Sequence, residues 1–159
     1  MTEDLTLHYK VSQFLAHEAD LLDLGNFQGW IELFAENAIY WLPCSSDQTD
    51  MHGQVSIILE DVPLLKLRVA RLSHPRAYSV TPPPATTHMV GNVTAERGQD
   101  YITVHSKIIL NQIRDDVSSS LSGNVTHHLL TTDSGFKILL KRVDLIGADG
   151  TFNVLSIPI

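Results

Sequence analysis

Residues 18–30 carry the sequence EADLLDLGNFQGW, in which one helix is predicted to end and another to begin. Gly25 suits a helix stop, because glycine readily adopts the left-handed backbone that often follows a last helical turn. Asn26 can cap the next helix, since its side-chain oxygen accepts a hydrogen bond from a free backbone N–H. The stretch therefore indicates two consecutive helices separated at Gly25.

Apolar residues extend the helical pattern in both directions. The stripe before Gly25 has helical spacing and consists of Val11, Phe14, Leu15, Ala19 and Leu22. The stripe after Gly25 puts aromatic bulk on one face of a short second helix and consists of Phe27, Trp30, Ile31 and Phe34. The spacings i, i+3, i+4 and i+7 are those of an amphipathic helix.

The next segments alternate between strand and loop. Residues 38–42 are predicted to form a short strand that closes at Pro43, and the polar residues 44–53 a loop. Residues 55–59 fit either a strand or the entry to a helix. Their pattern alone does not separate the two.

A third helix is predicted to begin at Asp61, because Pro63 fits a first helical turn. Its apolar line consists of Leu65, Val69 and Leu72, and His74-Pro75 is expected to end it. Residues 81–84 contain three prolines, which fix the backbone in an extended form.

Strands dominate the second half of the chain. They are predicted at 89–94, 101–114, 125–130, 136–146 and 153–159. Ile109 and Ile113 break the alternation of the second of these strands, which favours a bulge or burial on both faces. The serine-rich residues 115–123 are expected to form a turn, and 133–135 join two strands.

Helices followed by hairpin-connected strands indicate an α+β fold, with helices on one face of a mostly antiparallel sheet. We expect the sheet to be curved and to wrap around the long first helix, as in the cone of the nuclear-transport-factor-2-like superfamily. A length of 159 residues fits a single domain over residues 1–159.

Composition excludes several classes of protein. The net charge of −7 argues against a nucleic-acid binder, and no segment approaches the ~20 apolar residues of a membrane span. The lone cysteine, Cys44, excludes an internal disulfide, a CxxC zinc site and a four-cysteine iron–sulfur cluster. The N-terminal residues lack a signal-peptide pattern, so we expect a cytoplasmic protein.

Histidines and carboxylates supply only weak chemical candidates. His127 and His128 should point to opposite faces of a strand and cannot chelate one ion together. A site formed by His88, His105 and Asp144 would require them to converge across the sheet. We therefore expect no metal site on this chain.

Other polar and aromatic residues have two interpretations each. Asp23 is either a pocket base with a raised pKa or a helix-end carboxylate bonded to backbone donors or an arginine, and we favour the second. Tyr40 and Trp41 either line a pocket or belong to the core. Cys44 has no neighbouring base in the sequence, which argues against a nucleophile.

A basic cluster accompanies the third predicted helix. It consists of Lys66, Arg68, Arg71 and Arg76. Such a cluster is either a solvated helix face or a docking surface.

Residues 18–30, followed by Leu33 and by IYWLP at 39–43, resemble the small (β) subunit of aromatic-ring-hydroxylating dioxygenases. The family pattern is E-A-x-L-L-D, then F-x-x-W, then Y-W-x-P. The likeness continues through the third helix and covers nearly the whole chain. Ala85, Thr86 and Thr87 depart from it where many members have arginines, and Asn37 where an aspartate is common.

The resemblance implies a structural subunit without catalytic residues, usually in an α3β3 hexamer that degrades aromatic compounds. The α subunit would carry a Rieske [2Fe–2S] cluster, a mononuclear Fe(II) and the substrate pocket. The residues expected at subunit interfaces are Arg68, Arg71, Arg76, Trp41 and His88.

The alternative from another class is a stand-alone isomerase or dehydratase of the same cone fold, with an acid/base pair in its pocket. Its candidate residues are Asp23, Tyr40, His88 and His105. A third hypothesis is a homo-oligomeric binding module.

Overall fold

The first helix, α1, spans Thr2–Asp23 and buries one stripe of its surface. The buried residues are Leu7, Val11, Leu15, Glu18, Ala19, Leu21 and Leu22. The helix ends where predicted: the backbone N–H of Leu24 donates to Asp20, and Gly25 follows with φ +69°. The structure, a computed structural model, describes residues 1–72, 74, 84–147 and 158–159.

The second helix, α2, spans only Phe27–Ile31. Asn26 caps it as predicted, because its Oδ1 accepts a hydrogen bond from the Gly29 N–H at 2.9 Å. The prediction that Phe34 belongs to this helix is wrong. Ile138 donates its N–H to the carbonyl of Leu33, and this pairing draws the chain into the sheet from Phe34 onward. The Phe34 ring still packs edge-on against Trp30, with centroids 4.9 Å apart.

Strand β1 spans Phe34–Pro43, β2 spans Ser56–Asp61, and helix α3 spans Val62–Leu72. Residues 56–59 are thus a strand, because they pair with the outer edge of β1. The start of α3 is confirmed: the Asp61 carboxylate accepts a hydrogen bond from the Leu64 N–H at 3.1 Å. Leu65 and Val69 turn inward as the apolar line required.

The remaining strands build the larger part of the sheet. They are β3 (Ala85–Arg97), β4 (Ile102–Arg114), β5 (Val117–Thr132) and β6 (Gly135–Leu145). The six described strands form one sheet in the order β2-β1-β6-β5-β4-β3, in which β1 and β6 run parallel and all other neighbours antiparallel. The predicted α+β class with a mostly antiparallel sheet is confirmed.

Strands β3 and β5 extend beyond their predicted bounds. β3 is longer than residues 89–94, and its pairing with β4 shifts between Gly91 and Thr94, where Asn92 has φ +52°. The turn predicted at 115–123 is confined to Asp115 and Asp116, which both have positive φ. The serines that follow belong to β5, because a tight two-residue turn lets both strands of the hairpin continue pairing.

The prediction of a bulge or two-sided burial around Ile109 and Ile113 is wrong. β4 pairs with β5 without any shift, and alternate residues from Ile102 to Gln112 are buried. Ile109 and Ile113 lie on the opposite face, where they are 46% and 55% exposed. The sheet therefore has an outer face that is partly apolar.

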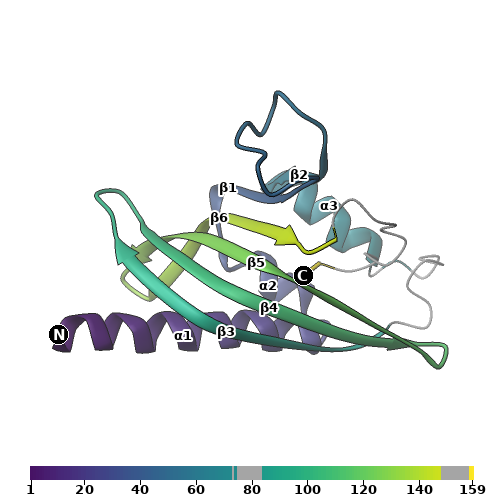
Figure 1. The fold of residues 1–159 in the computed structure, drawn as a ribbon, viewed down its shortest axis with the longest axis horizontal. Coiled ribbons are helices and arrows are strands. Elements are labelled where there is room, and N and C mark those ends of the chain that lie inside the picture. Colours follow the sequence, from purple (N-terminus) through teal and green to yellow (C-terminus); the bar gives the residue numbers. More distant parts are fainter. Residues whose placement is uncertain (73, 75–83, 148–157) are drawn as a thin grey trace.

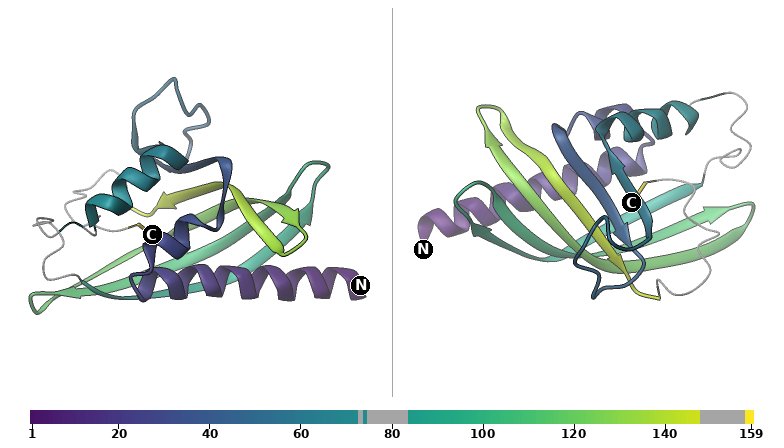
Figure 2. Two further views of the ribbon diagram at one scale, coloured as in Figure 1. Left: turned by 180° about the vertical axis from the view of Figure 1, so that it is seen from behind. Right: turned by 90° about the horizontal axis from the view of Figure 1, so that it is seen from above.

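Helix α1 runs along one face of the strongly twisted sheet and packs against β3, whereas α3 lies at the end that carries β1 and β2 (Figure 1). The two further views show the same arrangement from behind and from above (Figure 2). The core lies between α1, α2 and the inner face of the sheet. Residues 81–83 of the extended segment, 153–157 of the predicted last strand, and Arg76 lie outside the described residues.

Candidate functional site

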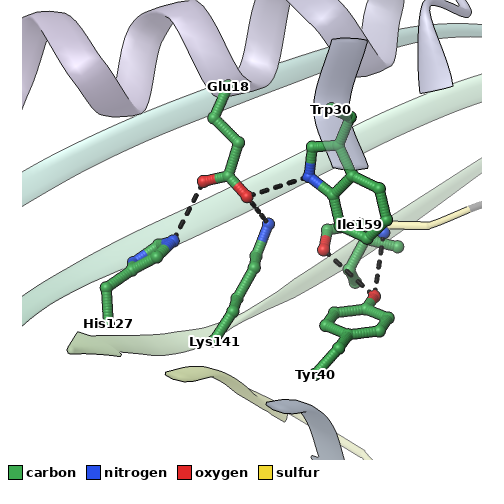
Figure 3. A network of polar contacts seen from close by, with 6 residues as sticks. All are labelled: Glu18, Trp30, Tyr40, His127, Lys141 and Ile159. Atoms are coloured by element: carbon green, nitrogen blue, oxygen red, sulfur yellow. Dashed lines mark hydrogen bonds and ion pairs between the residues drawn. The ribbon is translucent and has the colours of Figure 1, made fainter. Parts of the chain in front are cut away.

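Glu18 is the centre of a buried polar network between helix and sheet. It projects from α1 and is only 3% exposed. Its Oε1 accepts hydrogen bonds from Lys141 Nζ at 2.6 Å and from the Trp30 indole N–H at 3.1 Å, and its Oε2 lies 2.9 Å from His127 Nε2 (Figure 3). These contacts join α1, α2, β5 and β6 at one point.

The charges in this network compensate one another. Burial by itself would raise the pKa of Glu18, because a carboxylate loses its hydration in the interior. Attraction to Lys141 and His127 and the hydrogen bonds from both outweigh burial and hold the pKa of Glu18 well below its usual range. Glu18 is therefore ionised, and both of its oxygens already have partners inside the chain. This group therefore connects α1 to α2 and to the sheet.

Tyr40 is also committed to the interior. Its hydroxyl contacts both the N–H and the carbonyl of Ile159 at 3.1 Å, so it anchors the end of the chain to β1 (Figure 3). Burial raises the pKa of Tyr40, which keeps the phenol neutral. Its ring packs edge-on against Trp30, with centroids 5.4 Å apart. Of its two interpretations, the core residue is correct.

Asp23 and His88 form a second polar pair, at the end of α1. The Asp23 carboxylate accepts the His88 backbone N–H and the Thr86 hydroxyl, each at 3.0 Å, and lies 2.5 Å from His88 Nδ1. The favoured interpretation of Asp23, a helix-end carboxylate with a backbone donor, is confirmed, although its other donors are Thr86 and His88 and not an arginine.

The four residues of the alternative enzyme do not form one site. Asp23 and His88 touch, but Tyr40 is bonded to Ile159, and His105 is exposed on the outer face, 3.2 Å from Thr126. Asp144 is occupied by Arg142, so it does not join His88 and His105. In the part of the chain that the structure describes, no three His, Cys, Asp or Glu side chains are placed to share a metal ion, and no helix is long and apolar enough to cross a membrane.

The structure places the five predicted interface residues differently. Arg68 is bound by the Glu60 carboxylate, and Arg71 is exposed near the end of α3. Trp41 is 3% exposed, since Arg142 covers its ring and its indole N–H donates to Ser56. His88 is buried, and Arg76 lies outside the described residues. The interface role of all five stays a prediction.

The Glu18 network was not predicted from the sequence. His127 was correctly expected to point away from His128, and its burial confirms this. The sequence signal for this network is a charged residue, Lys141, on the buried face of a central strand. That signal can be recognised only when it is known which residues of the strand face inward. The parallel pairing of β1 with β6 sets that register and is not visible in the local pattern.

Comparison with known proteins relates the chain to one family. A family model described as "Ring hydroxylating beta subunit" matches residues 17–148. The 2-halobenzoate 1,2-dioxygenase small subunit of Burkholderia cepacia is 32% identical over 91% of this chain and 92% of its own length.

Solved structures agree with this likeness. A solved structure of naphthalene 1,2-dioxygenase has a TM-score of 0.84 at 19% identity, covering 97% of this chain and 86% of that one. The beta subunit of benzoate 1,2-dioxygenase from Burkholderia mallei has a TM-score of 0.74 at 25% identity, covering 90% and 93%. An NTF2-like protein with a cystatin-like fold from Novosphingobium aromaticivorans, at a TM-score of 0.60 and 15% identity over 95% and 86%, supports the predicted cone.

Proposed function

Because the chain belongs to the family of ring-hydroxylating dioxygenase beta subunits, we propose that it is the structural, non-catalytic β subunit of such an enzyme. In this role it holds α subunits in an α3β3 assembly in the cytoplasm. The α subunits carry the Rieske [2Fe–2S] cluster, the mononuclear Fe(II) and the aromatic substrate. The chain itself contributes position and not chemistry.

The observation that carries this proposal is that the buried carboxylate of Glu18 makes its contacts within its own chain. Its two oxygens contact the side chains of Lys141, His127 and Trp30. A general acid or base must reach the proton of a substrate, directly or through one water. A carboxylate whose partners all belong to its own chain stabilises the fold instead.

The outer face of the sheet supports a role in assembly. Met89 on β3 lies opposite Ile109 on β4, and Ile113 follows on the same side of β4. All three are large apolar residues that are at least 46% exposed. In the proposed assembly this exposed apolar stripe provides an apolar contact with a partner subunit. Arg71 lies on a different element, α3, and provides a separate charged contact.

The charged contact can be tested at Arg71. Arg68 is unsuitable, since reversing its charge would also break its ion pair with Glu60. Arg71→Glu is expected to raise the dissociation constant for the α subunit by about 10-fold or more, as for a paired charge that loses water in an interface. The measurement is light-scattering mass of the co-expressed complex over a dilution series.

Arg97→Glu is the matched control, because Arg97 is an exposed arginine at the far end of β3. It is expected to leave the mass profile unchanged. Assembly of Arg71→Glu at wild-type affinity would remove α3 from the proposed interface.

A further inference from the structure

Strand β3 forms one edge of the sheet, so among the described residues its outer side has no strand to pair with. The backbone N–H of His88 donates to the Asp23 carboxylate of α1 at 3.0 Å and therefore points away from β4. In an antiparallel pair, every second residue turns both its N–H and its C=O away from the partner strand. The C=O of His88 and both backbone groups of Val90 thus face the free edge of β3.

A hollow of about 370 Å³ follows this stretch of edge, between β3 and helix α1, which runs beside it (Figure 1). Val90 and His88 line it from the strand, and His88 does so through its backbone, since its side chain is fully buried. Ala16 lines it from α1 with a small, exposed side chain. The N–H of Val90 points the same way as that of His88, so it faces α1 across the hollow.

The free stretch of the β3 edge is short, because it is closed at both ends. At one end Asp23 accepts the His88 N–H and the Thr86 hydroxyl. At the other end the regular strand stops, since the pairing with β4 shifts after Gly91 and Asn92 has φ +52°. Interruptions of this kind disfavour edge-to-edge pairing with a second copy of the chain, which needs a long regular edge. The site suits a single short segment in extended conformation.

We propose that a short extended segment of the α subunit docks in this hollow as an added antiparallel strand beside β3. The segment exchanges two backbone hydrogen bonds with Val90 and donates a third to the C=O of His88, which is how peptides extend an exposed sheet edge. The net charge of −7 and the Asp20 carboxylate in the lining favour a segment that carries a basic residue. This inference rests on the function proposed above, which makes the α subunit the partner.

Amide hydrogen exchange at Val90 tests the added strand directly. In the purified complex with the α subunit, the Val90 N–H is expected to exchange about 10-fold more slowly than in the free chain, because it gains a hydrogen bond there. Exchange is quenched after a series of times and read residue by residue by NMR. Ala95 is the control amide: it lies opposite Val104, six residues before Leu110 in β4, so its N–H also faces the free edge, but it lies outside the hollow. Its exchange should change little.

Ala16→Leu blocks the hollow from the side of α1 and suits a helix, since leucine is a good helix former. It is expected to raise the dissociation constant for the α subunit by about 10-fold, because the added side chain occupies the place of the segment. His17→Leu is the matched control, because His17 is the exposed neighbour on α1 and does not line the hollow. It should assemble like the wild type in the same dilution series.

Two results would overturn the docking and leave the structural role intact. One is a complex that forms normally while its Val90 amide exchanges as fast as in the free chain. The other is an Ala16→Leu variant that assembles as tightly as His17→Leu. Failure of the wild-type chain to bind the α subunit at all would contradict the proposed function itself, and the docking with it.

Discussion

Glu18→Gln is expected to lower the free energy of unfolding by about 3–5 kcal/mol, the usual cost of removing one partner of a buried ion pair. The reason lies in what remains. Lys141 is 1% exposed and would be left in the interior without a counter-charge. Glutamine retains an oxygen for the Trp30 indole, so the loss reports chiefly on charge. Urea denaturation at pH 7 measures the difference.

A double-mutant cycle with Lys141→Met isolates the pair. Glu18→Gln leaves Lys141 without its counter-charge and Lys141→Met leaves Glu18 with His127 alone, whereas the variant with both substitutions removes both members of the pair, so the double variant should be more stable than the sum of the single losses predicts. Glu36→Gln, on the exposed side of β1, is the control and should cost little. The network does not hold the fold together if each single variant loses less than about 1 kcal/mol of unfolding free energy and the two losses simply add.

The dependence on pH provides a further check of the same ion pair. The pKa of Glu18 in the folded chain lies below its ordinary value of 4.5. A carboxyl group with a lowered folded pKa stabilises the fold above its unfolded pKa and loses that contribution as the pH falls toward the folded pKa. The stability gap between wild type and Glu18→Gln should therefore be constant above about pH 5 and shrink in more acidic solution.

Trp30→Ala should cost about 3–5 kcal/mol, as truncation of a buried aromatic residue usually does. Trp30 is 0% exposed, packs edge-on against Phe34 and Tyr40, and donates to Glu18. Trp30→Phe separates these contributions, because it keeps a ring in the core and removes only the indole donor. It should lose a smaller part of the stability. Thermal and urea unfolding of both variants provide the comparison.

Phe27→Ala is a matched control on the same short helix, since Phe27 is only partly buried. It should destabilise less than Trp30→Ala. A Trp30→Ala variant that unfolds like the wild type would contradict the placement of Trp30 at the centre of the core.

Local signals predicted the helices well. Gly25 and Asn26 act through backbone conformation and a single hydrogen bond, both of which depend on residues within one turn. The start of α3 at Asp61 is of the same kind. The pattern failed where a distant partner decides the structure. Phe34 joins the sheet because it pairs with Ile138 of β6, which lies 104 residues later in the chain.

The outer face of the sheet was misjudged for a different reason. Ile109 and Ile113 are apolar, and apolar residues in a strand usually indicate burial. Here they lie on the solvent side of this chain. A sequence that encodes an assembly carries apolar residues for contacts outside its own core, and the pattern of one chain does not distinguish these from core positions.

The candidate site was predicted only in part. Asp23 and His88 were both singled out, but their contact joins α1 to β3 across 65 residues and required the register of the sheet. Glu18 was noticed only as part of a motif, and its partners Lys141 and His127 come from strands at the other end of the chain. The polar network depends on contacts between segments that are far apart in the sequence, and local periodicity gives no information about such contacts.

The central claim, that this chain supplies position and not chemistry, is tested most directly by turnover per iron–sulfur centre in complexes separated by mass. Tyr40→Phe and His105→Gln each remove a polar group that the alternative enzyme would use, while Arg71→Glu is expected to impair assembly. We predict that activity follows the assembled fraction in every variant and is equal per centre within that fraction. A Tyr40→Phe or His105→Gln complex that assembles fully yet loses 10²-fold or more per centre, as loss of a general acid or base causes, would contradict the structural role.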